Sequence, residues 1–235
     1  MRKYLWAILV LFLAACGSST STKEKPKEEP KQTQDKEDVV EEKPADEAPA
    51  EVDEEESGEW EEADFGKVKI VGVGINEEIG MDGTETEGTP IEFGPMKLQL
   101  SELAVLEIEP TGDAAELYFE DKEKVKAVLM DMKVENTSED DITFNPNFSE
   151  IVTNTGEQVE SDIILSGDPG GDFLGKVTKE GQAWWILKDP DAEITSIKII
   201  INPPYGTDDF EEVGEEKRIE IEVIGFEEAK KKEGS

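Results

Sequence analysis

Apolar residues recur in short runs along the second half of the chain. The clearest run covers residues 125–134, where Met130, Met132 and Val134 alternate with Asp131 and Lys133. A period of two places successive side chains on opposite faces of an extended backbone, so this pattern predicts a β-strand. Similar patterns predict further strands at residues 68–73, 91–108, 142–144, 150–153, 183–187, 194–201 and 218–224.

Turn-forming residues separate these runs. Gly, Pro, Asn and Asp gather at residues 154–156, 167–171, 179–181 and 189–191. Short strands at regular spacing, with such turns between them, favour a β-sandwich. The exception is a short helix predicted over residues 113–119. About 170 residues bury one core, so we expect residues 63–235 to form a single all-β, immunoglobulin-like sandwich domain.

The first sixteen residues carry a different pattern. Arg2 and Lys3 precede an apolar run of about ten residues, which is the length of a secretory signal and short for a membrane span. The run ends in Leu13-Ala14-Ala15-Cys16, which resembles the bacterial lipobox. That resemblance implies removal of residues 1–15 as a signal peptide and diacylglycerol on Cys16. An ordinary secreted protein with a stray thiol, or a short uncleaved membrane helix, are the alternatives.

Residues 16–62 are dominated by Lys, Glu, Pro, Gln and Asp. So little apolar area cannot offset the entropy lost on ordering, which predicts a disordered linker. Its later part is almost purely acidic, and repulsion between like charges extends such a segment. We therefore expect a tether between the lipid anchor and the domain. Binding of cations or of a basic partner by the acidic run is the alternative.

The order of motifs within the domain resembles a known family. The chain has Val134-Glu135-Asn136-Thr137-Ser138, then Ile151-Val152-Thr153-Asn154-Thr155-Gly156-Glu157, then Lys179-Glu180-Gly181-Gln182-Ala183 leading into Trp184-Trp185-Ile186-Leu187, and a strand at residues 197–201. This order is similar to the telokin-like, immunoglobulin-like domain of unknown function found in Gram-positive bacterial lipoproteins. The resemblance implies an extracytoplasmic sandwich at the membrane.

The residue inventory excludes several kinds of chemistry. The chain has no histidine and one cysteine, Cys16. Catalytic triads of the usual kind, histidine general bases and common zinc or copper sites are therefore ruled out. Carboxylate chemistry of the glycosidase kind remains open, although so acidic a domain brings some carboxylates together in any fold. We expect no enzymatic activity and no required cofactor.

Two loops suggest a metal site. Flexible loops rich in carboxylates suit calcium, which takes hard oxygen ligands, although Asp and Gly are also ordinary turn residues. The candidate calcium ligands are Asp162, Asp168 and Asp172 in one loop and Asp189, Asp191 and Glu193 in the other.

Two adjacent tryptophans suggest a contact surface. Trp184 and Trp185 fall on a predicted strand, so their rings face opposite sides and one of them could be exposed to a partner. Cover of the outward ring by a loop or by the corner at residues 203–205 is the alternative.

The formal net charge of −35 limits the possible partners. Nucleic acid and anionic lipid surfaces are repelled by such a chain, so a basic or cationic partner is expected. Adaptation to a saline or alkaline habitat also explains the charge. The sequence as a whole predicts a lipid-anchored extracytoplasmic interaction module that binds an envelope protein or cell-wall component. The alternative is a small-ligand or calcium-binding accessory lipoprotein of a transporter or sensor.

Overall fold

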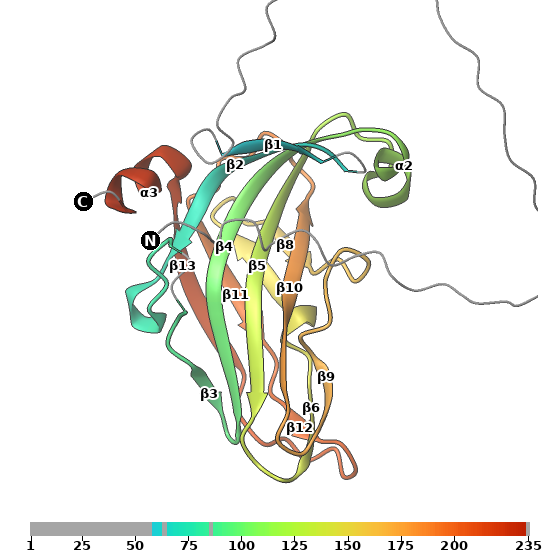
Figure 1. Cartoon of the computed structure of the whole chain (residues 1–235), viewed down its shortest axis with the longest axis vertical. Helices are drawn as coiled ribbons and strands as arrows, with labels where there is room; N and C mark the ends of the chain where they lie inside the picture. The colour runs from blue at the N-terminus through green and yellow to red at the C-terminus, as the bar shows by residue number, and fades with distance from the viewer. Residues whose placement is uncertain (1–57, 63–64, 85–86, 234–235) are drawn as a thin grey trace, which may run out of the picture. The chain divides into compact units, whose positions relative to one another are not determined.

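The computed structural model describes residues 58–62, 65–84 and 87–233, in which strands are the predominant secondary structure (Figure 1). The predicted signal peptide, Cys16 and nearly all of the predicted tether lie outside these residues. The elements are β1 (Glu59–Glu62), β2 (Gly66–Ile75), η1 (Glu77–Ile79), β3 (Ile91–Phe93), β4 (Met96–Pro110), α2 (Asp113–Phe119), β5 (Val125–Asn136), β6 (Asp141–Phe144), η2 (Pro146–Phe148), β7 (Glu150–Thr153), β8 (Gln158–Glu160), β9 (Gly171–Leu174), β10 (Thr178–Leu187), β11 (Ser196–Ile201), β12 (Tyr205–Gly206), β13 (Lys217–Gly225) and α3 (Phe226–Glu233).

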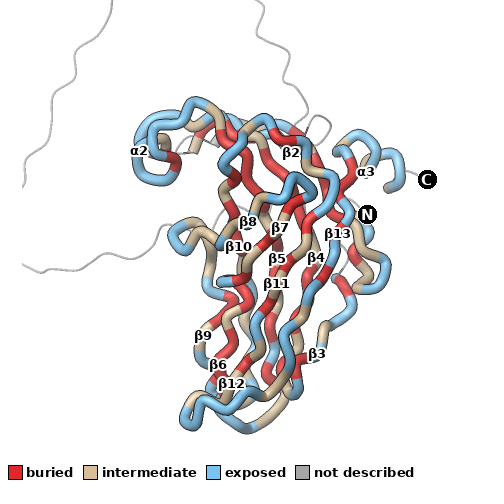
Figure 2. The backbone as a smooth tube through the Cα atoms, turned by 180° about the vertical axis from the view of Figure 1, so that it is seen from behind, coloured by how far each residue is buried: buried red, intermediate tan, exposed pale blue. Residues whose placement is uncertain are grey.

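Ten of the strands form one antiparallel sheet. Eight of them follow the order β10-β5-β4-β2-β13-β11-β7-β8, while β1 pairs with β2 and β3 pairs with β4. The pairing register shifts between Ile70 and Gly72 of β2 and between Leu100 and Leu103 of β4. Such irregularities bend a strand and increase its twist. The sheet curls accordingly into a half-barrel (Figures 1 and 2).

The segment that follows β8 joins the two ends of the curled sheet. The backbone N–H of Asp162 donates to the carbonyl of Trp184 at 2.7 Å, and the N–H of Gly167 donates to the carbonyl of Gln182 at 2.8 Å. Both acceptors belong to β10, the strand at the opposite end of the path. Residues 161–167 therefore cover the free edge of β10 without forming a strand.

The inward-facing side chains, which alternate with outward-facing ones along each strand, fill the inside of the curl. On β5, Val128, Met130, Met132 and Val134 are buried in the principal core cluster, together with side chains of β4, β10, β11 and β13. Buried and more exposed positions alternate along these strands (Figure 2). The opposite face of β4 and β5 carries a second cluster around Phe119 of α2. A single sheet thus supports an inner core and an outer apolar layer.

The tryptophan pair divides between these two clusters, as the period of two predicts. Trp185 is 0% exposed inside the curl, and its Nε1–H donates to the carbonyl of Ser149 at 2.9 Å. Trp184 is 7% exposed and lies 5.9 Å, centroid to centroid, from the ring of Phe65. The prediction of an exposed tryptophan contact is therefore wrong, because Phe65 and its neighbours cover the outward ring.

The second sheet is small and has the order β12-β6-β9. Phe144 on β6 and Phe173 on β9 point into the principal core, so the inner face of this sheet completes the filling of the curl. Its opposite face is turned away from the core. The small sheet lies at the end of the domain remote from α2 (Figure 1).

The all-β prediction is confirmed, but the strands do not form two facing sheets. Ten strands share one hydrogen-bonded sheet, in which β4 pairs with β2, β3 and β5. The turn predicted at residues 179–181 is also wrong, since β10 runs through it from Thr178 to Leu187. The strand β1 pairs with β2 at residues assigned to the tether, so the folded domain begins before residue 63.

Helices contribute little to the described part of the chain. The predicted helix over residues 113–119 is confirmed as α2. The C-terminal helix α3 covers Phe226–Glu233. Within the described ranges, neither helix is long and apolar enough to cross a membrane.

Candidate functional site

The outer face of the small sheet carries the most exposed aromatic ring of the described domain. Strand register places Leu174 of β9 beside Asp141 of β6, and Tyr205 of β12 beside Thr143 of β6. Leu174 is 68% exposed, and Phe210 in the turn after β12 is 73% exposed. The rings of Tyr205 and Phe210 stack with centroids 5.9 Å apart. We name this surface the outer face of the small sheet: Asp141, Thr143, Asp172, Leu174, Tyr205, Thr207 and Phe210.

A chain of hydroxyl groups fixes this face. Thr143 Oγ1 donates to Asp172 Oδ1 at 2.7 Å and lies 3.0 Å from Thr207 Oγ1. A hydroxyl has one proton to give, so Thr207 is the donor in the second bond. The carboxylate of Asp172 therefore orients both threonines, and through them it ties the turn after β12 to strands β6 and β9.

Phe210 occupies an unfavourable backbone conformation. Its φ is 59°, in the left-handed region that residues other than glycine, asparagine and aspartate seldom adopt. Its N–H donates to the carbonyl of Gly206 at 2.9 Å, and Asp209 Oδ1 accepts from the N–H of Glu211 at 3.0 Å. These bonds hold the strained turn, so the aromatic ring projects from a preorganised backbone.

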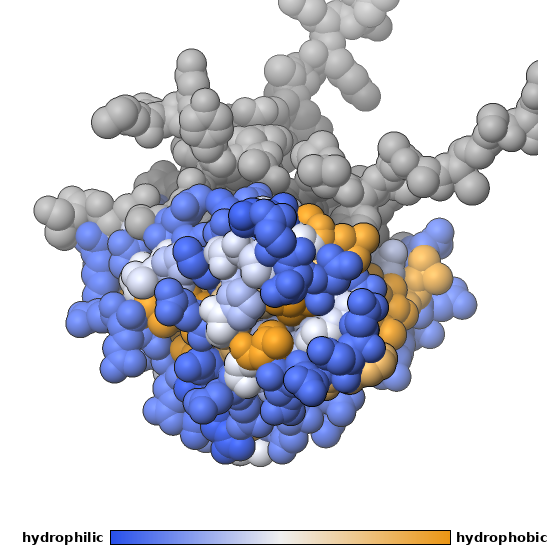
Figure 3. Space-filling view, turned by 90° about the horizontal axis from the view of Figure 1, so that it is seen from below, coloured by the Kyte–Doolittle hydropathy of each residue, from blue (hydrophilic) through white to orange (hydrophobic). Residues whose placement is uncertain are grey.

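Acidic side chains surround the apolar residues of this face. Asp141, Asp208, Asp209, Glu211 and Glu212 are all exposed. Viewed from this end, the molecule is mostly hydrophilic, with a small hydrophobic patch near the centre and further hydrophobic areas toward the sides (Figure 3). The surface thus combines exposed apolar side chains with neighbouring acidic residues.

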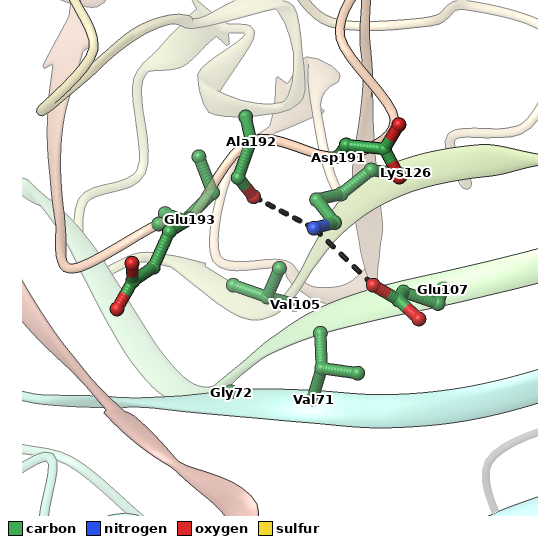
Figure 4. Close-up of a pocket in the computed structure, with 9 residues that line it drawn as sticks. Val71, Gly72, Val105, Glu107, Lys126, Asp191, Ala192 and Glu193 are labelled. Carbon is green, nitrogen blue, oxygen red and sulfur yellow. Dashed lines mark hydrogen bonds and ion pairs between the residues drawn. The ribbon is translucent and has the colours of Figure 1, made fainter.

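A pocket of about 200 Å³ lies at the end of the curl that β2, β4 and β5 share with the connection between β10 and β11. Its polar centre is Lys126, which is 5% exposed and whose ammonium points into the pocket (Figure 4). The Nζ atom donates to the carbonyl of Ala192 at 2.6 Å and pairs with Glu107 Oε1 at 3.3 Å. The pocket is lined by Val71, Gly72, Val105, Glu107, Lys126, Asp191, Ala192, Glu193 and Ile194.

A second lysine closes the ionic network at the rim of this pocket. Lys124 Nζ lies 3.0 Å from Asp191 Oδ1 and 3.6 Å from Glu107 Oε1. The hydrogen bond from Lys124 lowers the pKa of the Asp191 carboxyl, and the same bond raises the pKa of Lys124. Glu107 thus has two cationic partners. The network fastens the connection between β10 and β11 over the end of β5.

The six predicted calcium ligands are dispersed over several local structures. Asp162 Oδ1 accepts from the N–H groups of Ile164 and Leu165 at 2.8 and 2.9 Å, and Asp189 Oδ1 accepts from the N–H of Asp191 at 3.0 Å. Asp172 belongs to the small sheet, Asp168 lies in the connection before β9, and Asp191 and Glu193 border the Lys126 pocket. Among the described residues, no group of three acidic side chains could hold a metal ion.

Sequence reasoning missed the residues at the centre of both sites, although each left a signal. Lys126 shares the parity of Val128, Met130 and Met132, so the same alternation that predicts β5 points its side chain inward. Phe210 is flanked by four acidic residues, two on each side. Packing alone does not explain a charged residue at an inward-facing strand position. It also does not explain an aromatic residue within an acidic turn.

Asp131 is a buried carboxyl outside both sites, on the outer side of β5. Its Oδ1 is buried and has no hydrogen-bond partner among the described residues. Burial raises the pKa of this carboxyl above its ordinary value of 3.8, against a hydrogen bond from Gln182 that lowers it. Between the unfolded pKa and the raised folded pKa, the folded state binds more protons. Stability therefore falls as the pH rises through that interval.

Replacing Asp131 with asparagine should accordingly raise the free energy of unfolding at pH 7. We expect a gain of about 1 kcal/mol, the lower end of the range for a buried polar group without a partner. Below about pH 3 the wild-type carboxyl is protonated in both states, so the gain should vanish. Urea unfolding at both pH values measures it, with the exposed Asp208→Asn as the matched control. A gain independent of pH would contradict the role of the charge.

Comparison with known proteins relates the chain to bacterial lipoproteins. No family model matches it. It is 24% identical over 161 residues to the SPbeta prophage-derived uncharacterized lipoprotein YonS of Bacillus subtilis strain 168, across 63% of this chain and 77% of that protein.

Solved structures give more distant matches. A functionally unknown protein from Listeria monocytogenes EGD-e matches with a TM-score of 0.44 and 11% identity, across 59% of this chain and 83% of that one. A candidate lipoprotein of Bacillus subtilis, ycdA, matches with a TM-score of 0.40 and 12% identity, across 59% of this chain and 39% of that one.

Proposed function

We propose that this chain is an extracytoplasmic binding module, held at the membrane by lipid on Cys16, that recognises a protein of the cell envelope. The anchoring part of the proposal is supported by Leu13-Ala14-Ala15-Cys16 and by the similarity to a Bacillus lipoprotein. Two acyl chains make membrane attachment stable where one chain gives only marginal binding. The module acts by binding and carries out no reaction.

The observation that supports protein recognition is Phe210. A residue held at positive φ costs on the order of 1 to 3 kcal/mol, and such strain gathers at binding and catalytic sites. In this protein, the residue at positive φ is Phe210, and its ring is 73% exposed. Aromatic side chains are enriched among the few residues that dominate binding energy. A backbone already fixed by its own hydrogen bonds also loses little entropy on association.

The rim of the outer face of the small sheet defines the chemistry of the partner. An acidic rim around an apolar centre is complementary to a protein surface with an apolar depression bordered by Lys and Arg. Nucleic acid and anionic lipid are negatively charged, so the acidic rim repels them. The partner we expect is therefore a basic envelope protein, and its association should slow as ionic strength rises.

A test of this function places a photoreactive phenylalanine analogue at position 210 of the full chain in living cells. Irradiation should yield one discrete protein adduct. The matched control carries the same analogue at Leu117, which is 65% exposed on α2 at the other end of the domain (Figure 1). Position 117 should give no such adduct. Equal adducts from both positions would show nonspecific proximity and would overturn the assignment of this face.

The variant Phe210→Gly separates recognition from stability. Glycine adopts positive φ freely, so the relief of strain offsets the lost stacking on Tyr205, and the free energy of unfolding should change by no more than about 1 kcal/mol. Affinity for the partner identified by the adduct should fall at least roughly thirtyfold, as for a binding hot spot. Calorimetric titration and thermal unfolding measure the two quantities. Unchanged affinity would refute the role of the ring.

A small-ligand function is the second candidate, and the Lys126 pocket is the observation that favours it. The inside of the curl is filled by the principal core cluster, which leaves no room there for a large ligand. The pocket at the end of the curl borders that core through Val71, Val105 and Ile194, and it contains a buried charge.

A further inference from the structure

We propose that the Lys126 pocket binds a free aliphatic α-amino acid as a zwitterion, with the ligand carboxylate on Lys126. This inference is independent of the proposed protein recognition, because the pocket and the outer face of the small sheet share no residue.

The buried ammonium calls for an anionic group. An ammonium has three N–H donors, and two of those on Lys126 point to the carbonyl of Ala192 and to Glu107. Glu107 is shared with Lys124, which lies 3.6 Å from it, and Lys124 pairs more closely with Asp191 at 3.0 Å. The remaining N–H of this 95%-buried ammonium can bind a further acceptor in the pocket. A ligand carboxylate would supply this acceptor.

The charge of the whole chain restricts that carboxylate to a ligand without net charge. A formal charge of −35 repels free anions from the surface. A zwitterion escapes this repulsion, because its ammonium compensates its carboxylate. Asp191 and Glu193 lie at the rim of the pocket, where the ligand ammonium would meet them. The arrangement of a cation at the centre and carboxylates at the rim matches the polarity of an α-amino acid.

The size of the pocket and the chemistry of its walls restrict the side chain that the ligand can have. Val71, Val105 and Ile194 supply apolar walls, which favour an aliphatic side chain over a polar one. The volume of about 200 Å³ is below the roughly 300 to 1,000 Å³ of pockets for drug-sized ligands. A single amino acid of the size of valine or leucine is therefore the expected ligand, and a peptide is too large.

Calorimetric titration of the full chain with leucine tests the inference directly. We expect saturable binding, with leucinamide, which lacks the carboxylate, and 4-methylpentanoate, which lacks the ammonium, each binding at least about tenfold more weakly. Glutamate should bind more weakly than leucine, because of its extra charge. Absence of saturable leucine binding, or equal binding of leucinamide, would overturn the proposal.

Two variants locate the site. Lys126→Met removes the charge at similar length and leaves Glu107 paired with Lys124, so the fold should persist while leucine affinity falls at least tenfold. Ile194→Trp fills the pocket from its wall without changing a charge, and it should abolish binding. Thermal unfolding confirms that each variant is folded. If both folded variants retain wild-type affinity, leucine binds elsewhere and the assignment of this pocket is wrong.

Discussion

Replacement of Trp185 with alanine is expected to lower the free energy of unfolding by about 3 to 5 kcal/mol, the usual cost of truncating a large buried aromatic side chain. Trp185 is 0% exposed in the principal core cluster. Its Nε1–H also reaches the carbonyl of Ser149, which precedes β7, near the opposite end of the strand path from β10. This side chain therefore occupies part of the curl and connects β10 with the residue that precedes β7.

The expected loss is large relative to the stability of the domain, because domains of this size are stable by only about 5 to 15 kcal/mol. Urea unfolding followed by circular dichroism measures it. Trp185→Phe keeps most of the ring volume but removes the donor to Ser149, so it should cost roughly 1 to 3 kcal/mol. Leu117→Ala, at an exposed position, should change stability by less than about 0.5 kcal/mol. A Trp185→Ala cost below about 1 kcal/mol would show that the curl closes without this side chain.

The strands and the short helix could be predicted because their signals are local. Alternation along residues 125–134 is sufficient to identify most of β5, and the predicted helix at residues 113–119 coincides with α2. The turn predicted at residues 179–181 failed for a physical reason. Gly181 lies opposite Met132 in the middle of the β10–β5 ladder, where a missing side chain makes room for Pro169.

The arrangement of the strands could not be predicted in the same way. An inward and outward alternation is common to a sandwich and to a curled sheet, so it does not distinguish them. The distinction depends on pairings between distant segments, such as β2 with β13. It depends also on where β2 and β4 shift register. These features follow from the packing of the whole core, which a single sequence does not display.

The candidate sites show the same limit. Asp162 and Asp189 were predicted as calcium ligands because carboxylates in loops suit calcium, but each accepts a backbone N–H in its own turn. Composition cannot separate a capping carboxylate from a ligand. Lys126 and Phe210 become candidates only when burial and backbone angle are known, since one is a charge in the interior and the other an exposed ring at positive φ.

Replacement of Cys16 with alanine is expected to abolish lipid attachment completely and to move the protein out of the membrane fraction. The apolar run before Cys16 has about ten residues, which is too short to hold the chain as a permanent span. Membrane retention then depends on acyl chains, each buried CH₂ of which contributes about 0.8 kcal/mol. Removal of the thiol removes every one of these contributions at once.

Mass spectrometry of the N-terminal peptide and fractionation of cells measure the two parts of this expectation. Wild-type protein should begin at Cys16 and carry acyl mass, and Ser18→Ala is the matched control that keeps both properties. The soluble Cys16→Ala protein should still bind leucine and the partner captured at Phe210, because both sites lie in the domain described from residue 58 onward. Retention of Cys16→Ala in the membrane, together with a wild-type N terminus free of acyl mass, would refute lipidation. Loss of leucine binding in the soluble variant would instead mean that recognition requires the membrane, and would contradict the independence of anchor and domain.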